Sequence, residues 1–173
     1  MAFRIVGLVT AALLSATPEN TDFGQALVAF DAQRTHWRTE LQTADGVLIE
    51  SQGTGPSLWL GWAIFIPAAT PGTFQAAELA VTRVNRLAGR LDAGELARLE
   101  ERSSRHAGYS YRCRCLDASA LTVTIRRKGK ISILSAYGLD DEAKQEGAVV
   151  LREWDALHDR LLGQADTRRD TAL

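Results

Sequence analysis

The stretch Leu58-Trp59-Leu60-Gly61-Trp62-Ala63-Ile64-Phe65-Ile66 decides how this chain is expected to fold, because it is apolar at nearly every position. Alternate side chains of a strand point to opposite faces, so that one face carries Trp62 and Ile64 and the other carries Trp59 and Phe65. A strand that is apolar on both faces is typical of the centre of a sheet that is covered on both sides. We therefore predict a central strand, with turn sequences before and after it at 53–56 and 70–72.

Segments on either side extend this prediction. Residues 47–51 alternate in the manner of a short strand, and residues 18–44 place Phe23, Leu27 and Phe30 at helical spacing, which favours a short helix. Residues 74–88 fit both a helix and a strand. We favour a strand that pairs back onto 58–66, because elements joined by short connections are commonly neighbours in a sheet.

A helix over about 93–104 has a well-defined start. Asp92 is a good N-cap, Glu95 follows three residues later as in a capping box, and Leu91 and Leu96 occupy the positions of a hydrophobic staple. Leu96 and Leu99 form its buried stripe, and Gly108 lies beyond its end.

Three further strands are expected at 109–115, 121–125 and 131–137, the last two forming a hairpin around Arg127-Lys128-Gly129. A two-residue turn would set Ile125 opposite Ser132 and separate the apolar faces. We therefore predict a three-residue loop, with Ile125 opposite Ile131 and Gly129 in the left-handed conformation.

A final helix should begin after Asp140 or Asp141, weaken at Gly147 and end at Gly163. Its buried stripe is Val150, Trp154, Leu157 and Leu161. The predicted fold class is α+β, with a single antiparallel sheet of about five or six strands and two main helices on one face. We expect one domain over 17–163 and a loose C-terminal tail over 164–173.

The N-terminus has the three parts of a secretory signal peptide. Arg4 supplies the positive charge, residues 5–14 are uncharged and mostly apolar, and Ala16 is a suitable last residue. The apolar run is too short to cross a bilayer as a helix, which takes about 20 residues. We predict a signal peptide over 1–16 and a periplasmic or secreted protein. A first buried strand or helix of a cytoplasmic protein is the alternative.

Composition excludes several function classes. The 173 residues are 46% hydrophobic, as in an ordinary globular domain. The sequence has 20 basic and 21 acidic residues. Removal of the signal peptide takes away Arg4, so the mature chain has a net charge of about −2. Nucleic-acid binding requires a clearly basic face, so no nucleic-acid partner is expected. No later apolar run predicts a membrane span in the mature chain.

Cys113 and Cys115 are the only cysteines. In an exported protein such a pair is a candidate disulfide. A regular strand holds residues i and i+2 about 6.6 Å apart, near the upper limit for a bridge, so that bonding requires a local bend. A reducible redox pair and two small buried side chains are the alternatives.

No catalytic or metal-binding constellation is recognisable. His36, His106 and His158 are scattered, and no metal-ligand or hydrolase spacing occurs. The acids at 140–142 are interpreted as a helix N-terminal charge group, and Asp155 with Asp159 as a solvated helix face. We expect no cofactor and no enzymatic activity.

Candidate partner contacts come from one tryptophan and one basic loop. Trp59 and Trp62 point to opposite faces of their strand, so at least one belongs to the core, and Trp59, beside the glycine-rich turn, is the candidate anchor. Arg126, Arg127 and Lys128 form a basic hairpin tip that would suit an acidic partner, or simply keep the strand ends soluble.

About 80 residues carry a family resemblance. The sequences Val81-Thr82-Arg83-Val84, 89–100 and 121–130, followed by a final amphipathic helix, resemble the small bacterial emfourin-type inhibitors of thermolysin-like metalloproteases. They are also similar to related exported domains of unknown function. The resemblance implies a possible protease inhibitor, and no inhibitory residue carries over.

The expected function is therefore that of an exported, non-enzymatic binding domain, with another protein as its partner. Two alternatives stay open. One is a structural or assembly protein of the envelope that pairs with another subunit. The other is an envelope enzyme whose site is assembled from scattered acids and histidines, which a deep pocket with convergent side chains would favour.

Overall fold

The computed structural model describes residues 12–13, 23–53, 61–80, 83–113, 118–139 and 143–169 of the chain. These form an α+β fold with three helices, α1 (Phe23–Thr43), α2 (Ala93–Arg105) and α3 (Glu146–Arg169). The strands of the described part are β1 (Ala12–Leu13), β2 (Gly46–Gln52), β3 (Gly61–Pro67), β4 (Thr73–Ala80), β5 (Arg83–Arg90), β6 (Ser110–Arg112), β7 (Ala120–Arg127) and β8 (Lys130–Tyr137). They make one sheet in the order β1-β5-β4-β3-β2-β7-β8-β6.

The sheet is mixed and has more strands than the sequence predicted. Residues 74–80 and 83–88 belong to two antiparallel strands, β4 and β5, the first of which pairs with β3 as expected. β6 pairs with β8 in parallel, so the expectation of a purely antiparallel sheet is wrong. The cause is topological. The chain reverses between β6 and β7 and again between β7 and β8, so that β6 and β8 run the same way along the outer edge.

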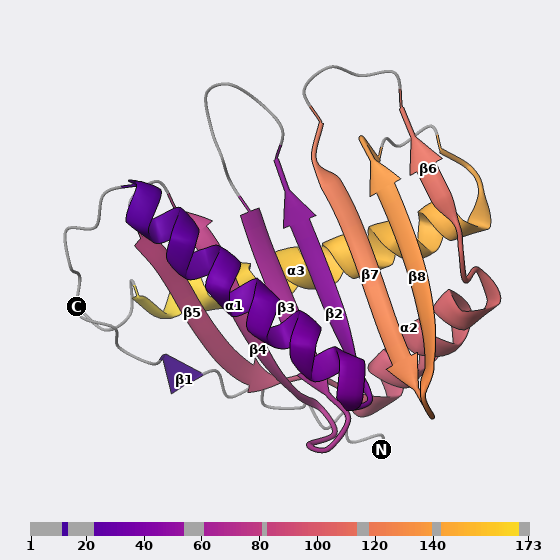
Figure 1. Ribbon diagram of the computed structural model, residues 1–173, viewed down its shortest axis with the longest axis horizontal. Coiled ribbons are helices and arrows are strands. Elements are labelled where there is room, and N and C mark those ends of the chain that lie inside the picture. The colour runs from indigo at the N-terminus through magenta and orange to yellow at the C-terminus, as the bar shows by residue number, and fades with distance from the viewer. Residues whose placement is uncertain are drawn as a thin grey trace, which may run out of the picture.

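Helices cover both faces of the sheet (Figure 1). The two main helices of the prediction, α2 and α3, lie on one face as expected, whereas α1 covers the opposite face. One core cluster joins α2 and α3 to strand residues such as Ile64 and Val123. The other joins α1 to the opposite face through Phe30 and Trp37, which pack with Phe65. α1 is therefore a full structural layer, since its apolar stripe has a sheet face of its own to bury.

The central strand is confirmed where it is described. Ile64 and Ile66 belong to the core on the α3 side, whereas Ala63 and Phe65 belong to the core under α1. β3 lies between β2 and β4. Residues 54–60, and with them the predicted partner anchor Trp59, lie outside the described residues.

The capped helix is also confirmed. α2 begins after Asp92, whose side chain accepts a hydrogen bond of 2.7 Å from the backbone N–H of Glu95. Leu96 and Leu99 are buried. The local capping chemistry therefore sets the start of this helix, as its sequence indicated.

The β7–β8 hairpin corrects the predicted loop. Arg127 pairs with Lys130, which leaves a two-residue turn at Lys128 and Gly129, with φ of 50° and 75°. Positive φ at both positions is the geometry of a type I′ turn. Val123 faces Leu134, which is fully buried, whereas Ile131 and Ile133 are 52% and 47% exposed. The prediction chose the wrong apolar pair, because a one-residue shift exchanges the two faces of a strand.

Both ends of α3 differ from prediction. The helix begins at Glu146, not after Asp140 or Asp141, and it continues through Gly163 to Arg169. A single glycine costs a helix only about 1 kcal/mol, which packing easily offsets. The buried stripe of Val150, Trp154, Leu157 and Leu161 is confirmed. Residues 170–173 of the predicted tail lie outside the described residues.

Gly147 has a packing role that its sequence did not reveal. A Cβ atom at this position would lie 2.4 Å from Cγ of Tyr109. The Tyr109 ring rests on the first turn of α3, and its hydroxyl donates a hydrogen bond of 2.6 Å to Gln145. The residue that weakens the helix therefore allows the chain before β6 to pack against it.

The predicted signal peptide lies mostly outside the described residues. Ala12 and Leu13 are described, and they pair as β1 with Ala88 and Leu87 of β5. This pairing places them at one edge of the sheet, and the prediction of export stays a prediction.

Candidate functional site

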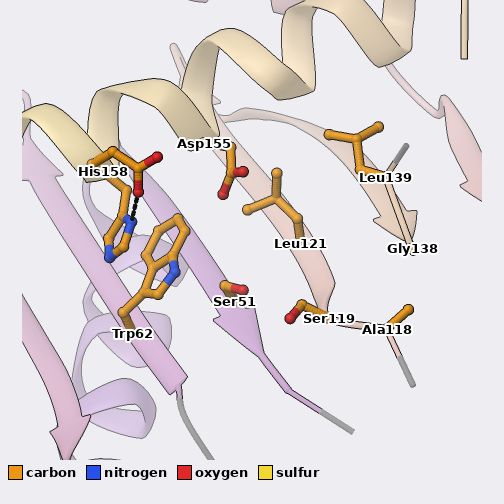
Figure 2. A pocket seen from close by; sticks show the side chains of 10 residues that line it. Ser51, Trp62, Ala118, Ser119, Leu121, Gly138, Leu139, Asp155 and His158 are labelled. Carbon is orange, nitrogen blue, oxygen red and sulfur yellow. Dashed lines mark hydrogen bonds and ion pairs between the residues drawn. The ribbon is translucent and has the colours of Figure 1, made fainter. Parts of the chain in front are cut away.

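A cleft of about 430 Å³ lies between α3 and one end of the sheet (Figure 2). It contains hydroxyl, carboxyl, imidazole, indole and apolar groups. The residues that line it are Ser51, Trp62, Ala118, Ser119, Leu121, Gly138, Leu139, Asp155, His158 and Asp159.

The floor of the cleft is a row of side chains on three adjacent strands. Ser51 of β2 pairs with Trp62 of β3 on one side and with Leu121 of β7 on the other. Directly paired residues point to the same face of a sheet, here the face under α3. The strand register therefore brings together three positions that are far apart in the chain.

The wall of the cleft comes from one turn of α3. Asp155, His158 and Asp159 are spaced i, i+3 and i+4, which places them on one side of the helix. The buried stripe of α3 next to them anchors the helix on the sheet. Packing of this stripe thus sets the height of the three polar side chains above the floor.

His158 lies flat on Trp62. The two ring centroids are 3.8 Å apart, with an angle of 11° between the planes. Nδ1 of His158 lies 3.1 Å from Oδ1 of Asp159, which fits an Nδ1–H donor. Nε2 is buried and has no hydrogen-bond partner among the described residues. Burial lowers the pKa of His158 below its usual range, although the bond to Asp159 opposes this shift.

Asp155 is half-buried, and its carboxylate is directed into the cleft (Figure 2). Burial raises the pKa of Asp155, and the negative charge of Asp159 raises it further. Within the described part of the chain, no basic side chain forms an ion pair with it. The interpretation of Asp155 as part of a solvated helix face is therefore wrong, whereas the Asp159 side chain is indeed 77% exposed.

The charged side chains described in the cleft are acidic. Of its described lining residues, two are carboxylates and none is Lys or Arg. Glu78 of β4 adds negative charge near His158 and is itself held by Asn85 at 3.1 Å. Such a surface attracts positive charge.

The sequence did not predict this cleft. Trp59 and not Trp62 was the predicted partner anchor, because strand periodicity cannot show where α3 leaves the sheet uncovered. Asp155 and His158 fall three residues apart next to the apolar stripe, which was the one available signal. The other histidines lie elsewhere: His36 is exposed on α1, and His106, at the end of α2, is 3.3 Å from Glu146.

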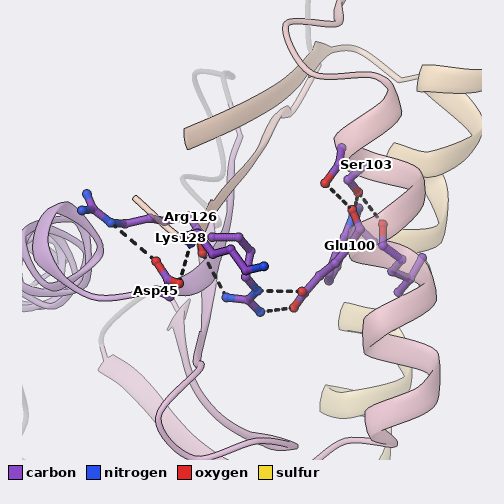
Figure 3. Close-up of polar contacts among 9 residues, drawn as sticks. Asp45, Glu100, Ser103, Arg126 and Lys128 are labelled. Carbon is purple, nitrogen blue, oxygen red and sulfur yellow. Dashed lines mark hydrogen bonds and ion pairs between the residues drawn. The ribbon is translucent and has the colours of Figure 1, made fainter. Parts of the chain in front are cut away.

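The predicted basic contact residues lie at the opposite end of β7 (Figure 3). Arg127 binds Glu100 of α2 through two nitrogens, one of them at 2.9 Å. Arg126 contacts the Gln42 carbonyl oxygen and lies 3.8 Å from Asp45. Two of the three predicted contacts thus fasten the hairpin to its neighbours, and an acidic partner for this loop stays a prediction.

Asp45 organises the tip of this hairpin. Its carboxylate accepts hydrogen bonds from the backbone N–H groups of Lys128 at 2.7 Å and Gly129 at 3.4 Å. The Lys128 bond is the largest cause that lowers the pKa of Asp45. A side chain from the α1–β2 connection therefore stabilises the turn that the sequence analysis rejected.

The candidate disulfide is described at one of its two residues. Cys113 is disulfide-bonded. Cys115 lies outside the described residues, so the pairing of the two cysteines stays a prediction. Among the residues that the structure describes, no group of three or more His, Cys, Asp or Glu side chains could hold a metal ion.

No family model matches this chain, and no curated protein or solved structure matches it either. The resemblance to emfourin-type inhibitors therefore stays a prediction. No helix in the described part of the chain combines the length and hydropathy needed to cross a membrane.

Proposed function

We propose that this chain is the non-enzymatic binding domain of an exported protein. We also propose that the cleft lined by Trp62, Asp155 and His158, called the Trp62 cleft from here on, is its binding site. One observation carries the proposal: the half-buried carboxylate of Asp155 has no ion-pair partner among the described residues, and it shares its cleft with an indole. A buried charge without a partner lowers stability. Such a group is expected where a ligand completes the site.

The size and scaffold of the cleft support binding. Its volume of about 430 Å³ falls within the range of small-ligand pockets. Ser51, Trp62 and Leu121 stand on adjacent strands whose positions are set by the sheet register. Sites on rigid elements hold their geometry better than sites on loops, so this cleft is suited to recognition by preformed contacts.

The arrangement of the polar groups favours binding over nucleophilic catalysis. A histidine base must lie within hydrogen-bond reach of the hydroxyl that it activates. Nδ1 of His158 is engaged by Asp159, and Trp62 stands between the imidazole and Ser51 (Figure 2). The stack instead holds the indole in one orientation, which is useful for recognition.

A fragment screen by heteronuclear NMR tests the cleft. We expect bound fragments to move the indole N–H resonance of Trp62 and to leave that of Trp37, buried between α1 and the sheet, in place. Both Trp62 variants lack the indole, so binding to them is followed through the backbone amide resonances of Ser51 and Leu121. Trp62→Leu should lose binding, whereas Trp62→Phe, which keeps an aromatic ring, should retain part of it. Fragments that bind equally well to Trp62→Leu, or none that binds at all, would contradict the proposal, as would turnover of a substrate.

Export has a separate test. The intact mass of the protein from its native host should correspond to a chain that begins near Thr17. A chain that begins at Met1 or Ala2 would overturn the localisation and leave the cleft proposal standing, because the two rest on different residues.

A further inference from the structure

We infer that the Trp62 cleft binds an organic cation of the guanidinium or alkylammonium type, with the cation between the free face of the indole and the Asp155 carboxylate. This inference rests on the proposed function and adds the chemistry of the ligand. Figure 2 shows the juxtaposition: His158 covers one side of Trp62, and Asp155, Leu121 and Ser51 lie toward the other.

The first argument is charge. Among the described residues that line the cleft, Asp155 and Asp159 are acidic and none is Lys or Arg. The described basic side chains nearest along α3 are used elsewhere, since Arg152 donates to the Ala143 carbonyl at 2.9 Å and Arg160 pairs with Glu95. The cleft therefore lacks an internal cation among its described lining residues, and a bound cation would supply the missing charge.

The second argument is the aromatic surface. A cation over the face of a tryptophan is attracted by the ring quadrupole, and tryptophan is the best of the aromatic residues for this contact. The planar guanidinium also stacks on rings and forms two parallel hydrogen bonds to a carboxylate. Leu121 and Leu139 provide an apolar surface for the alkyl stem of such a side chain.

The third argument is the state of His158. A protonated imidazole on Trp62 would itself be the cation of the site and would repel another. Burial lowers the pKa of His158, so the ring is neutral at neutral pH although Asp155, Asp159 and Glu78 all favour its charged form. The neutral ring supports the indole without competing for the carboxylates.

Matched peptides test the inference. The probes are the acetylated, amidated tripeptides Ala-Arg-Ala and Ala-citrulline-Ala, which differ in charge and scarcely in shape, together with Ala-Lys-Ala and free agmatine. We expect the arginine peptide to move the Trp62 indole resonance with an affinity at least about tenfold above the citrulline peptide. Agmatine carries a guanidinium and an ammonium group, so stronger binding of agmatine would indicate a free small-molecule cation as the ligand, whereas stronger binding of the arginine peptide would indicate a protein side chain.

Asp155→Asn is the decisive variant. It should lower the affinity for the arginine peptide by about tenfold or more, as expected when a charge-assisted contact in a partly buried site is lost. Glu101→Gln removes one negative charge from an exposed site on α2 and should leave the affinity unchanged. Because burial raises the pKa of Asp155, its ionised form opposes folding above that pKa, so Asp155→Asn should be at least as stable as the parent at neutral pH.

Acidification gives a second readout. As the pH falls, Asp155 becomes protonated and His158 becomes charged, with Asp159 and Glu78 as the other acids that face them. Both changes should lower the affinity for the arginine peptide. Equal binding of the arginine and citrulline peptides, or full affinity in Asp155→Asn, would overturn the cation assignment. If neutral fragments still move Trp62, the binding site stands; if nothing moves it, both proposals fail.

Discussion

Glu50→Ala is expected to lower the free energy of unfolding by about 3 kcal/mol, because it removes the buried carboxylate that neutralises Arg34 and leaves this arginine with the exposed Asp31, 3.3 Å away, as its remaining acidic partner. Glu50 and Arg34 are each 7% exposed, and their side chains meet between β2 and α1. Nε of Arg34 donates to Glu50 at 2.9 Å, and Nε of Arg38 donates to the other carboxylate oxygen at 3.1 Å. Chemical denaturation followed by circular dichroism measures the change.

Two controls separate the buried charge from ordinary surface effects. Arg38→Ala removes the exposed partner, whose side chain is 52% accessible, and should cost less than about 1 kcal/mol. The double variant Arg34→Met with Glu50→Leu removes both buried charges and should recover most of the stability. If Glu50→Ala cost as little as Arg38→Ala, Arg34 would have to reach water, and the buried cluster would not stabilise the α1 layer.

Trp154→Ala should lower the free energy of unfolding by about 3–5 kcal/mol, the usual range for removing a large aromatic side chain from a core. Trp154 is fully buried between α2, α3 and the sheet. Its indole N–H donates to Oγ of Ser103 at 2.8 Å, and Ser103 in turn donates to the Leu99 carbonyl at 2.7 Å. The indole thus joins α3 to α2 by a polar contact inside an apolar core.

Smaller substitutions isolate that hydrogen bond. Ser103→Ala should cost about 1–3 kcal/mol, because the indole N–H loses its acceptor in the core. In a Trp154→Phe background the same serine change should cost clearly less, since no indole N–H is left unsatisfied. Equal costs in both backgrounds, measured by thermal unfolding, would show that the hydrogen bond does not couple the helices.

Sequence patterns were reliable where one local rule acted alone. Asp92 and Glu95 specify the start of α2 through hydrogen bonds within a few residues. The continuous apolar run in 61–66 indicates a strand covered on both sides, because a strand with one face in water would carry polar residues at alternate positions. The spacing from Val150 to Leu161 likewise revealed the buried side of α3. These features are properties of single segments, so the amino-acid sequence was enough to predict them.

Contacts between distant segments decided the rest. The prediction assigned the wrong residues of β8 to the core. Ile133 and Leu134 are equally apolar, and only the layer that covers each face of the sheet determines which of them is buried. The cleft needed two strand registers, of β2 with β3 and of β2 with β7, and the placement of α3 to bring Asp155 and His158 over Trp62. No spacing along the chain encodes that meeting, since the burial and the neighbouring charges that alter the pKa values of these side chains exist only in the folded protein.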